Sequence, residues 1–377
     1  MHMSKQRIGS IHFLRFFAMF MVVLVHVTGT YINTLPMDSG AFQKYHFLNR
    51  IIRIEAGIFI MITGLVFFYN YFSKSITLSF LKEYMRKRAV FILLPYVIWA
   101  IFYEWYAYQI GFREVNVTES VLRIIQGESY YQLHFIFIIV QLYLVLPIFI
   151  YLAQHLQLFK KYMWAFGIAI ELIYFMIDSR FDIIPFSFFL NSLGTFLLGA
   201  WLGIYFLEQK EKVRSRTNYL LGILAVSAGV ATVYTHYHLY ILNTIELPGI
   251  YYKVINLIFI MSASYLCFRL AEIFSESWYE GVQKVVRNVA AYSFGFYLIH
   301  PFVLKEVARF IPTHSNYWFH VELLMRYVVT CALCFMIIWL FHRFTPFASW
   351  LFGKLPKQAP SLKPAYRHEA NQYTHSS

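Results

Sequence analysis

Apolar runs of about twenty residues recur along the chain, and they constrain its fold more than any other feature. The first, IHFLRFFAMFMVVLVHVTGTY at 11–31, is long enough to cross a bilayer, and we expect it to remain as the first helix because no small-residue cleavage site follows it. We predict an all-α integral membrane protein, a bundle of about ten transmembrane helices. The expected spans are 11–31, 50–72, 89–109, 133–154, 162–178, 185–207, 218–239, 250–271, 289–310 and 321–343.

The composition agrees with the lipid bilayer as the main partner. Hydrophobic residues make up 59% of the 377 residues and charged residues 14%, whereas a soluble domain has about 25% charged residues. The formal net charge is +13, but the basic residues lie in short clusters between apolar runs, as in cytoplasmic loops, so we predict no nucleic-acid partner. We expect one membrane domain at 1–349 and a disordered cytoplasmic tail at 350–377.

The distribution of basic residues predicts the orientation. If the N-terminus is cytoplasmic and ten helices follow, 22 of the 32 Lys and Arg residues fall on the cytoplasmic side and 10 on the outer side. This asymmetry favours a cytoplasmic location for both termini. An odd number of spans would break the pattern.

Ionisable residues within the expected spans sort by depth. Arg15 and Arg88 lie near the cytoplasmic ends of their spans, whereas His26, Glu55 and His300 lie deeper or toward the outer side. Such residues usually face a bundle interior or a wet cavity. We therefore predict a cavity whose cytoplasmic entrance attracts an anion and whose deeper wall moves protons.

Arg15 and His26 are spaced to share one helix face. Eleven residues correspond to about 16 Å of rise and bring the two side chains to within about 20° of each other. Arginine suits phosphate recognition, and histidine suits general base catalysis because its pKa lies near neutrality. One helix can therefore hold an anionic ligand and carry out chemistry further out.

Each of these residues also has a structural alternative. Arg15 and Arg88 are alternatively anchors at the membrane surface, and His26 alternatively makes a hydrogen bond between helices. His300 and the following Pro301 are alternatively a packing kink. For several polar residues a structural role is favoured or remains open, namely Glu55, which is near Arg53 in sequence, and Glu104, Glu171 and His134. Cys331 and Cys334 form a lone pair inside an expected span, so we predict no metal site and no disulfide framework there.

Six stretches in order resemble one family of membrane enzymes. They are FLRFFAMFMVVLVH with Arg15 and His26, GIFIMITGLVFF (57–68), KRAVFILLPYVIW (87–99), QLHFIFIIVQLYLVLPIF (132–149), FLLGAWLGIY (196–205) and YSFGFYLIHP (292–301). Together they resemble the acyltransferase type 3 family, whose members acylate sugars, over roughly residues 5–345. Within that family the chain is similar to intercellular-adhesin-type proteins that modify or export polysaccharide. It departs from the family pattern at Phe91, where a second arginine often follows the Lys-Arg pair.

The resemblance implies a donor, an acceptor and a location. The donor is cytoplasmic acyl-CoA, expected to be acetyl-CoA, with no permanently bound cofactor, and its phosphates contact Arg15, Arg86, Lys87 and Arg88. His26 acts as general base or first accepts the acyl group, and Glu55 or His300 orients it. The acceptor is a saccharide hydroxyl on the outer side of a bacterial cytoplasmic membrane. A polysaccharide synthase is a candidate partner, and the extracytoplasmic hydrolase-like domain of some members is not expected.

A second class of function remains open. The chain is alternatively an exporter of a polysaccharide or amphiphile without acyl chemistry, because aromatic segments such as FYEWYAY at 102–108 also suit stacking on sugar rings. A purely structural membrane subunit is disfavoured by the number of ionisable residues within the spans. Release of free CoA from a thioester distinguishes the enzyme from the exporter.

Overall fold

The computed structural model describes residues 8–314 and 317–360, and within these residues the regular elements are all helices. The first half contains α1 (Ser10–Ile32), α2 (Gly40–Ile51), α3 (Ile54–Tyr71), α4 (Leu78–Arg88), η1 (Ala89–Leu93), α5 (Leu94–Gln109), α6 (Val117–Gln126), α7 (Leu133–His155), α8 (Gln157–Lys161) and α9 (Met163–Phe181). The second half contains η2 (Phe189–Ser192), α10 (Leu193–Ile204), α11 (Phe206–Glu211), η3 (Lys212–Arg214), α12 (Thr217–His236), η4 (Tyr237–Ile241), α13 (Gly249–Ser277), α14 (Glu280–Ala290), α15 (Ser293–Phe310), α16 (Phe319–Phe344) and α17 (Ala348–Phe352).

Seven helices in the described part of the chain are long and apolar enough to cross a membrane. They are Ser10–Ile32, Gly40–Tyr71, Leu78–Gln109, Leu133–His155, Thr217–Ile241, Gly249–Ser277 and Phe319–Phe344, and an eighth span results if Phe189–Ile204 and Phe206–Arg214, which bend by 91°, form one broken span. The two other expected spans coincide with α9 and α15, which are helical but carry three charged residues each. The all-helical membrane bundle is therefore confirmed, and the count of about ten spans stays a prediction.

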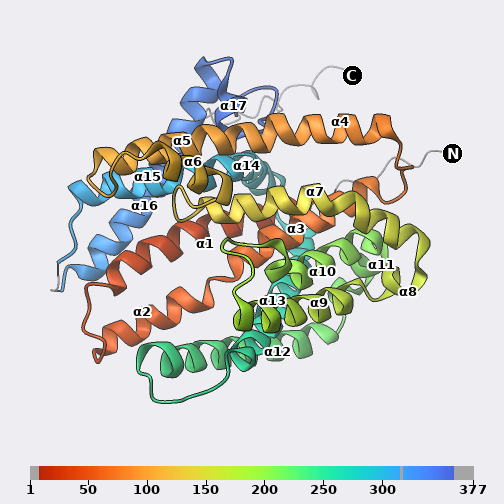
Figure 1. Cartoon of the computed structure of the whole chain (residues 1–377), viewed down its shortest axis with the longest axis horizontal. Coiled ribbons are helices and arrows are strands. Elements are labelled where there is room, and N and C mark those ends of the chain that lie inside the picture. Colours follow the sequence, from red (N-terminus) through yellow and green to blue (C-terminus); the bar gives the residue numbers. More distant parts are fainter. Residues whose placement is uncertain (1–7, 315–316, 361–377) are drawn as a thin grey trace, which may run out of the picture.

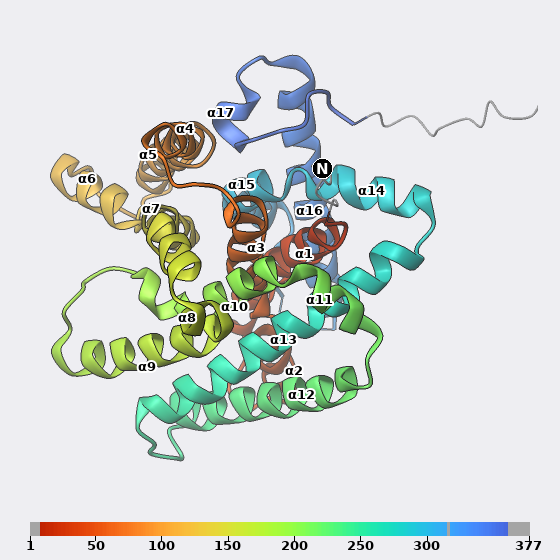
Figure 2. The same cartoon turned by 90° about the vertical axis from the view of Figure 1, so that its right-hand side faces the viewer.

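The helix α1 lies in the middle of the bundle. Most of the long helices run along the horizontal of Figure 1, and Figure 2 shows α1 with α15 and α16 on one side of it and α13 and α12 on the other. It contacts α2, α3, α13, α14, α15 and α16. The side chains of about half of this helix are buried by these neighbours, whereas Phe17 is 49% exposed.

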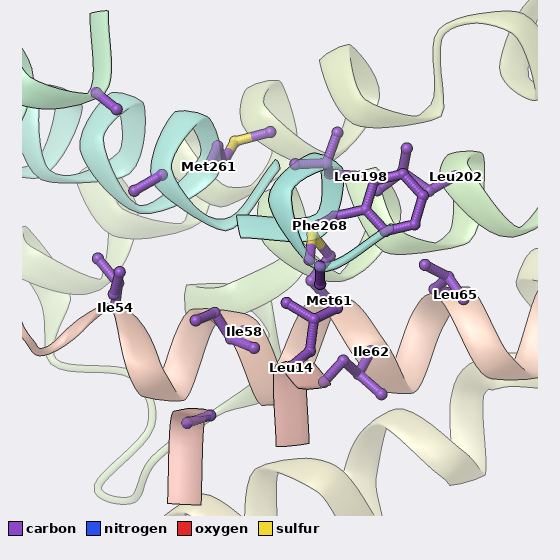
Figure 3. Packing of buried hydrophobic residues seen from close by; sticks show 14 of the residues in the cluster. Leu14, Ile54, Ile58, Met61, Ile62, Leu65, Leu198, Leu202, Met261 and Phe268 are labelled. Carbon is purple, nitrogen blue, oxygen red and sulfur yellow. The ribbon is translucent and has the colours of Figure 1, made fainter. Parts of the chain in front are cut away.

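One face of α1 is fixed by a hydrophobic cluster that it shares with α3, α10 and α13. Leu14, Ala18, Met21 and Val25 are buried in this cluster, and their three- and four-residue spacing places them on one stripe of the helix. Figure 3 shows Leu14 next to α3, among side chains of α3, α10 and α13 that include Ile58, Met61, Ile62, Leu198 and Phe268. With this stripe packed, the face that carries Arg15 and His26, about 100° away around the helix, turns toward α7 and α15.

The helices α3 and α10 pack with their backbones close together because small residues line the contact. A Cβ atom added to Gly199 would overlap the Met61 carbonyl oxygen, and one added to Gly203 would lie 2.5 Å from the Leu65 carbonyl oxygen. On the facing helix, a Cβ atom on Gly64 would overlap the Phe196 carbonyl oxygen. These glycines belong to two of the quoted sequence stretches, and their role is close helix packing of the small-xxx-small type.

Polar helices extend or connect the spans where the sequence suggested loops. The helix α2 begins after Ser39, whose side chain accepts a hydrogen bond from the Phe42 amide, and α4 begins after Thr77, which caps the Phe80 amide in the same way. Between α4 and α5, the segment η1 forms one π-helical turn just ahead of Pro95. Proline has no amide hydrogen to continue the α-helical pattern, which accounts for the widened turn at this place.

The predicted boundary of the disordered tail at 349/350 does not hold. The helix α17 crosses it, Phe352 is buried against Trp99, and the Trp99 indole donates a hydrogen bond to the Leu351 carbonyl at 2.8 Å. Aromatic packing therefore holds these residues against α5, although their polar sequence context predicted a disordered tail. Residues 361–377, the rest of the expected tail, lie outside the described residues.

Candidate active site

The imidazole rings of His26 and His300 lie against each other inside the bundle. Their centroids are 5.1 Å apart and their planes differ by 27°, which is a stacked arrangement between α1 and α15. His300 is completely buried, and His26 is partly accessible. The expected contact between these two residues is therefore present, although it is a stacking contact and not a hydrogen bond.

The hydrogen bonding of His300 fixes its tautomer. Its Nδ1 atom lies 3.0 Å from the Phe296 carbonyl oxygen, and since a carbonyl oxygen can only accept, Nδ1 carries the hydrogen. In the neutral ring the Nε2 atom is then a lone-pair acceptor. It is buried and has no hydrogen-bond partner in the described part of the chain. A buried acceptor without a donor is uncommon and marks a place that a ligand can complete.

A side chain from another helix completes the hydrogen bonding around Pro301 of α15. Pro301 has no amide hydrogen, and next to it the hydroxyl of Tyr103 on α5 donates to the Leu298 carbonyl at 2.7 Å and accepts from the Phe302 amide at 3.4 Å. Gln132, at the start of α7, lies 3.5 Å from the same Leu298 carbonyl. Insertion of a side chain into the helical hydrogen-bond ladder is a recognised cause of helix bending. This arrangement positions the His300 ring.

A tyrosine also contacts the His26 ring. The Tyr131 ring lies 4.6 Å from the His26 ring at 46°, and Tyr131 also lines a pocket of about 420 Å³ between the α5–α6 connection and the start of α7. His134, in the same pocket, contacts the Tyr131 carbonyl through Nδ1 at 2.5 Å. The imidazole pair is therefore separated from this pocket by one aromatic ring.

Glu55 forms no hydrogen bond with either imidazole ring among the described residues. It lies in the first turn of α3 with 8% of its surface exposed, and its Oε2 atom has no hydrogen-bond partner. Arg53 is close enough to act electrostatically on both Glu55 and His26, but its Nε atom donates to Asn49 at 3.3 Å and no ion pair with Glu55 is formed in the described chain. Neutralisation of Arg53 by direct pairing is therefore not the role of Glu55.

Two of the four predicted cytoplasmic cations come together around Tyr143 of α7. The Arg88 guanidinium lies 4.7 Å from the centroid of the Tyr143 ring and 4.8 Å from that of Tyr84. Arg15 is close enough to Tyr143 for an electrostatic contact, and it forms no ion pair or hydrogen bond with the described residues. An unpaired guanidinium inside a bundle is a candidate site for an anionic ligand.

The other two predicted cations lie away from this place. Lys87 is exposed and pairs with Glu83 one turn earlier on α4 at 2.5 Å, and Arg86 is exposed on the same helix. The helical turn therefore separates the run into one inward arginine, Arg88, and two outward residues.

The polar residues for which a structural role was favoured have internal partners. Glu104 forms ion pairs with Arg113 at 3.1 Å and Arg123 at 2.8 Å. Glu171 pairs with Lys253 at 2.6 Å and accepts a hydrogen bond from the Gly194 amide at 2.8 Å. These contacts tie loops and helices together and leave both carboxylates occupied.

Sequence reasoning did not find the tyrosines of the site. Tyr103 donates a hydrogen bond to α15, Tyr131 contacts His26, and the Tyr143 ring contacts Arg88. One signal was available, because Tyr131 immediately precedes the quoted QLHFIF stretch. Tyr103 and Tyr143 also lie within quoted stretches, FYEWYAY (102–108) and QLHFIFIIVQLYLVLPIF (132–149), but no pattern in those stretches assigned a role to either residue.

The helical bundle thus holds a stacked imidazole pair, with His300 buried, and an arginine on the same helix as His26, about three turns away. A family model described as an acyltransferase domain matches residues 8–343, which is most of the chain. The chain therefore belongs to the acyltransferase type 3 family and is a multi-pass membrane acyltransferase. The comparisons with curated proteins and with solved structures found no match.

Proposed function

We propose that the protein transfers an acyl group from cytoplasmic acyl-CoA, in particular acetyl-CoA, to a hydroxyl of a saccharide on the opposite side of a bacterial cytoplasmic membrane. The observation that carries the proposal is the position of two groups on α1. Arg15 is unpaired near one end of the helix, and His26 stacks on the unsatisfied His300 about 16 Å further along. The first group suits a phosphate and the second suits proton transfer.

The donor is bound by charge at the cytoplasmic end. Arg15 and Arg88 contact the CoA phosphates, where hydrogen bonds between charged groups are strong. The Tyr143 ring contacts the Arg88 guanidinium and is close enough to act electrostatically on Arg15. Arg86 and Lys87 lie on the outside of α4 and attract the polyanionic donor over a longer range.

The transfer step occurs at His26. The saccharide hydroxyl gives its proton to the His26 ring as its oxygen attacks the thioester carbonyl, so that a C–O bond forms and a tetrahedral intermediate results. When this intermediate collapses, the C–S bond breaks, CoA leaves as a thiolate and takes up the proton from His26. His300 positions the His26 ring by stacking, and its free Nε2 atom accepts a hydrogen bond from the reacting molecule. Glu55 supplies negative charge near the imidazolium.

The experiment that tests this function uses the purified protein and acetyl-CoA. We expect release of free CoA and formation of an acyl ester on the cell-surface glycan, both abolished in His26→Ala at normal membrane abundance. Acylation that persists in this variant contradicts the role of His26. Movement of glycan across the membrane without release of CoA contradicts the enzyme and supports the exporter.

A further inference from the structure

The pocket next to Tyr131 is lined by the connection between α5 and α6, by the residues from Gly127 to His134, and by Lys305 of α15. The helix α6 ends at Gly127, whose φ of 80° lies in the left-handed region and whose missing Cβ leaves room for Phe137. The chain then turns back over the start of α7. Glu104 holds both flanks of this segment through its ion pairs with Arg113 and Arg123. The pocket is therefore preformed, and its volume of about 420 Å³ falls in the range of roughly 300–1,000 Å³ usual for small-molecule sites.

A row of aromatic rings connects the pocket to the imidazole pair. Tyr130 stacks on the buried Tyr103 with centroids 4.5 Å apart and planes 17° apart, and Tyr131 lies 5.0 Å from Tyr130. Tyr131 in turn lies 4.6 Å from His26 and is 45% exposed. One part of the Tyr131 ring thus contacts the proposed base while another part is open to the pocket.

The groups around these rings have the chemistry of a sugar-binding site. Phe112, Tyr130 and Tyr131 provide apolar aromatic surface, and Glu128 and Lys305 provide an acceptor and donors on the rim. Neither Glu128 nor Lys305 forms an ion pair within the described residues, and the charge of Arg113 is already balanced by Glu104. The rim therefore carries one free negative and one free positive group. Apolar faces with a few polar groups, and little net charge, suit a neutral saccharide better than an anion.

We infer that this pocket binds the saccharide acceptor, and that Tyr131 is the wall along which the acceptor hydroxyl reaches His26. The inference rests on the proposed function and adds the place and the kind of acceptor, a neutral pyranose. It also assigns Tyr130 and Tyr131 as acceptor-binding residues and Lys305 as a donor to the hydroxyls. The donor site around Arg15 and Arg88 is separate from them, about three helical turns away along α1.

Two measurements on the same variants test the inference. The first is the ester-linked acyl content of the native surface polysaccharide, released by mild alkali from cells that carry a variant in place of the wild-type chain. The second is the Kd of acetyl-CoA for the purified full chain, measured by calorimetry. In Tyr131→Ala and Lys305→Gln we expect the ester content to fall at least tenfold while the Kd of acetyl-CoA stays within twofold of wild type.

Two further variants separate ring packing from general damage. Tyr131→Phe keeps the aromatic wall and should recover most of the ester content that Tyr131→Ala loses. Tyr219→Ala, at an exposed tyrosine on α12 outside the pocket, should equal wild type in both measurements. Unchanged ester content in Tyr131→Ala, or a loss of acetyl-CoA affinity that accompanies the loss of ester, overturns the inference. Failure of the proposed function has a different signature, namely equal ester content in wild type and His26→Ala.

Discussion

The Tyr103 hydroxyl donates a hydrogen bond to the Leu298 carbonyl at 2.7 Å, which joins α5 to α15 three residues before Pro301. Tyr103 is fully buried, so the contact is made without competition from solvent. Its ring also supports Tyr130 through stacking. One residue thus shapes both the helix that carries His300 and the wall of the adjacent pocket.

Removal of this hydroxyl should lower stability. In Tyr103→Phe the Leu298 carbonyl and the Phe302 amide lose a buried partner, and we expect the free energy of unfolding to fall by about 1–3 kcal/mol. Thermal unfolding in detergent measures the change. Tyr108→Phe is a matched control, because Tyr108 is on the same helix and half exposed, and it should unfold like wild type. Equal stability of both variants would show that the hydroxyl does not stabilise α15 at Pro301.

The free Nε2 atom of His300 can be tested apart from the stacking of its ring. His300→Phe keeps an aromatic ring against His26 but removes the acceptor, and we expect CoA release to fall by about 10- to 100-fold at normal membrane abundance, since a hydrogen bond to a reacting group is worth about 1.5–3 kcal/mol. His300→Gln, which keeps a polar acceptor, should retain more activity than the phenylalanine variant. Wild-type turnover in His300→Phe would assign His300 to packing alone.

Substitutions of the basic residues at the end of α4 should differ in their effect on acetyl-CoA binding, according to whether the side chain faces inward or outward. Arg88→Gln removes the guanidinium held between Tyr84 and Tyr143, and we expect the KM for acetyl-CoA to rise about tenfold or more with a smaller change in kcat, as for a lost charged hydrogen bond. Arg15→Gln should behave in the same way. Arg86→Gln, at an exposed position of the same helix, should change KM by less than about twofold, because exposed charges are screened. Steady-state kinetics as a function of acetyl-CoA concentration measure all three. Equal effects at Arg86 and Arg88 would contradict the inward placement of Arg88.

The contact between α3 and α10 should tolerate no added side chain. Gly199→Ala places a methyl group against the Met61 carbonyl, and we expect a loss of about 1–3 kcal/mol and lower abundance in the membrane, because overpacking forces the helices apart. Gly222→Ala is the matched control. Gly222 also lies in a helix, α12, but its Cβ position is open, so alanine there should be neutral or slightly stabilising. Quantitative immunoblots and thermal unfolding report both changes, and a stable Gly199→Ala variant would disprove the close packing.

The membrane class and the imidazole pair could be predicted from sequence because both depend on strong local signals. A run of twenty apolar residues has few soluble alternatives, and ionisable residues inside such runs must face other protein groups. Arg15, His26 and His300 stand out for this reason. The contact between His26 and His300, which are more than 270 residues apart in the sequence, follows from helix packing. The family resemblance supported the prediction of this contact.

Other features depend on tertiary contacts that no local pattern reports. Asn116 caps α6 by accepting a hydrogen bond from the Glu119 amide at 3.2 Å. The same cap signals at Ser39 and Thr77 would have predicted α2 and α4, which the hydropathy pattern missed because these helices are polar. The roles of Arg88 and Arg86 differ only through the orientation of α4, and the roles of Tyr103 and Tyr131 only through the neighbours they meet.

Between Arg15 and His26 the helix α1 contains neither proline nor glycine, so this segment is a straight, stiff helix that keeps the two residues at a fixed distance. A donor whose phosphates bind at Arg15 must span this distance to place its thioester at His26. The part of the donor that spans it is the CoA moiety, which every CoA ester shares. Discrimination between short and long acyl tails must then arise beyond the imidazole, on surfaces contributed by other helices. Substitutions that alter the preference for acyl chain length should accordingly lie in α5, α7 and α15. Substitutions in α1 between Arg15 and His26 should affect all acyl-CoA donors alike.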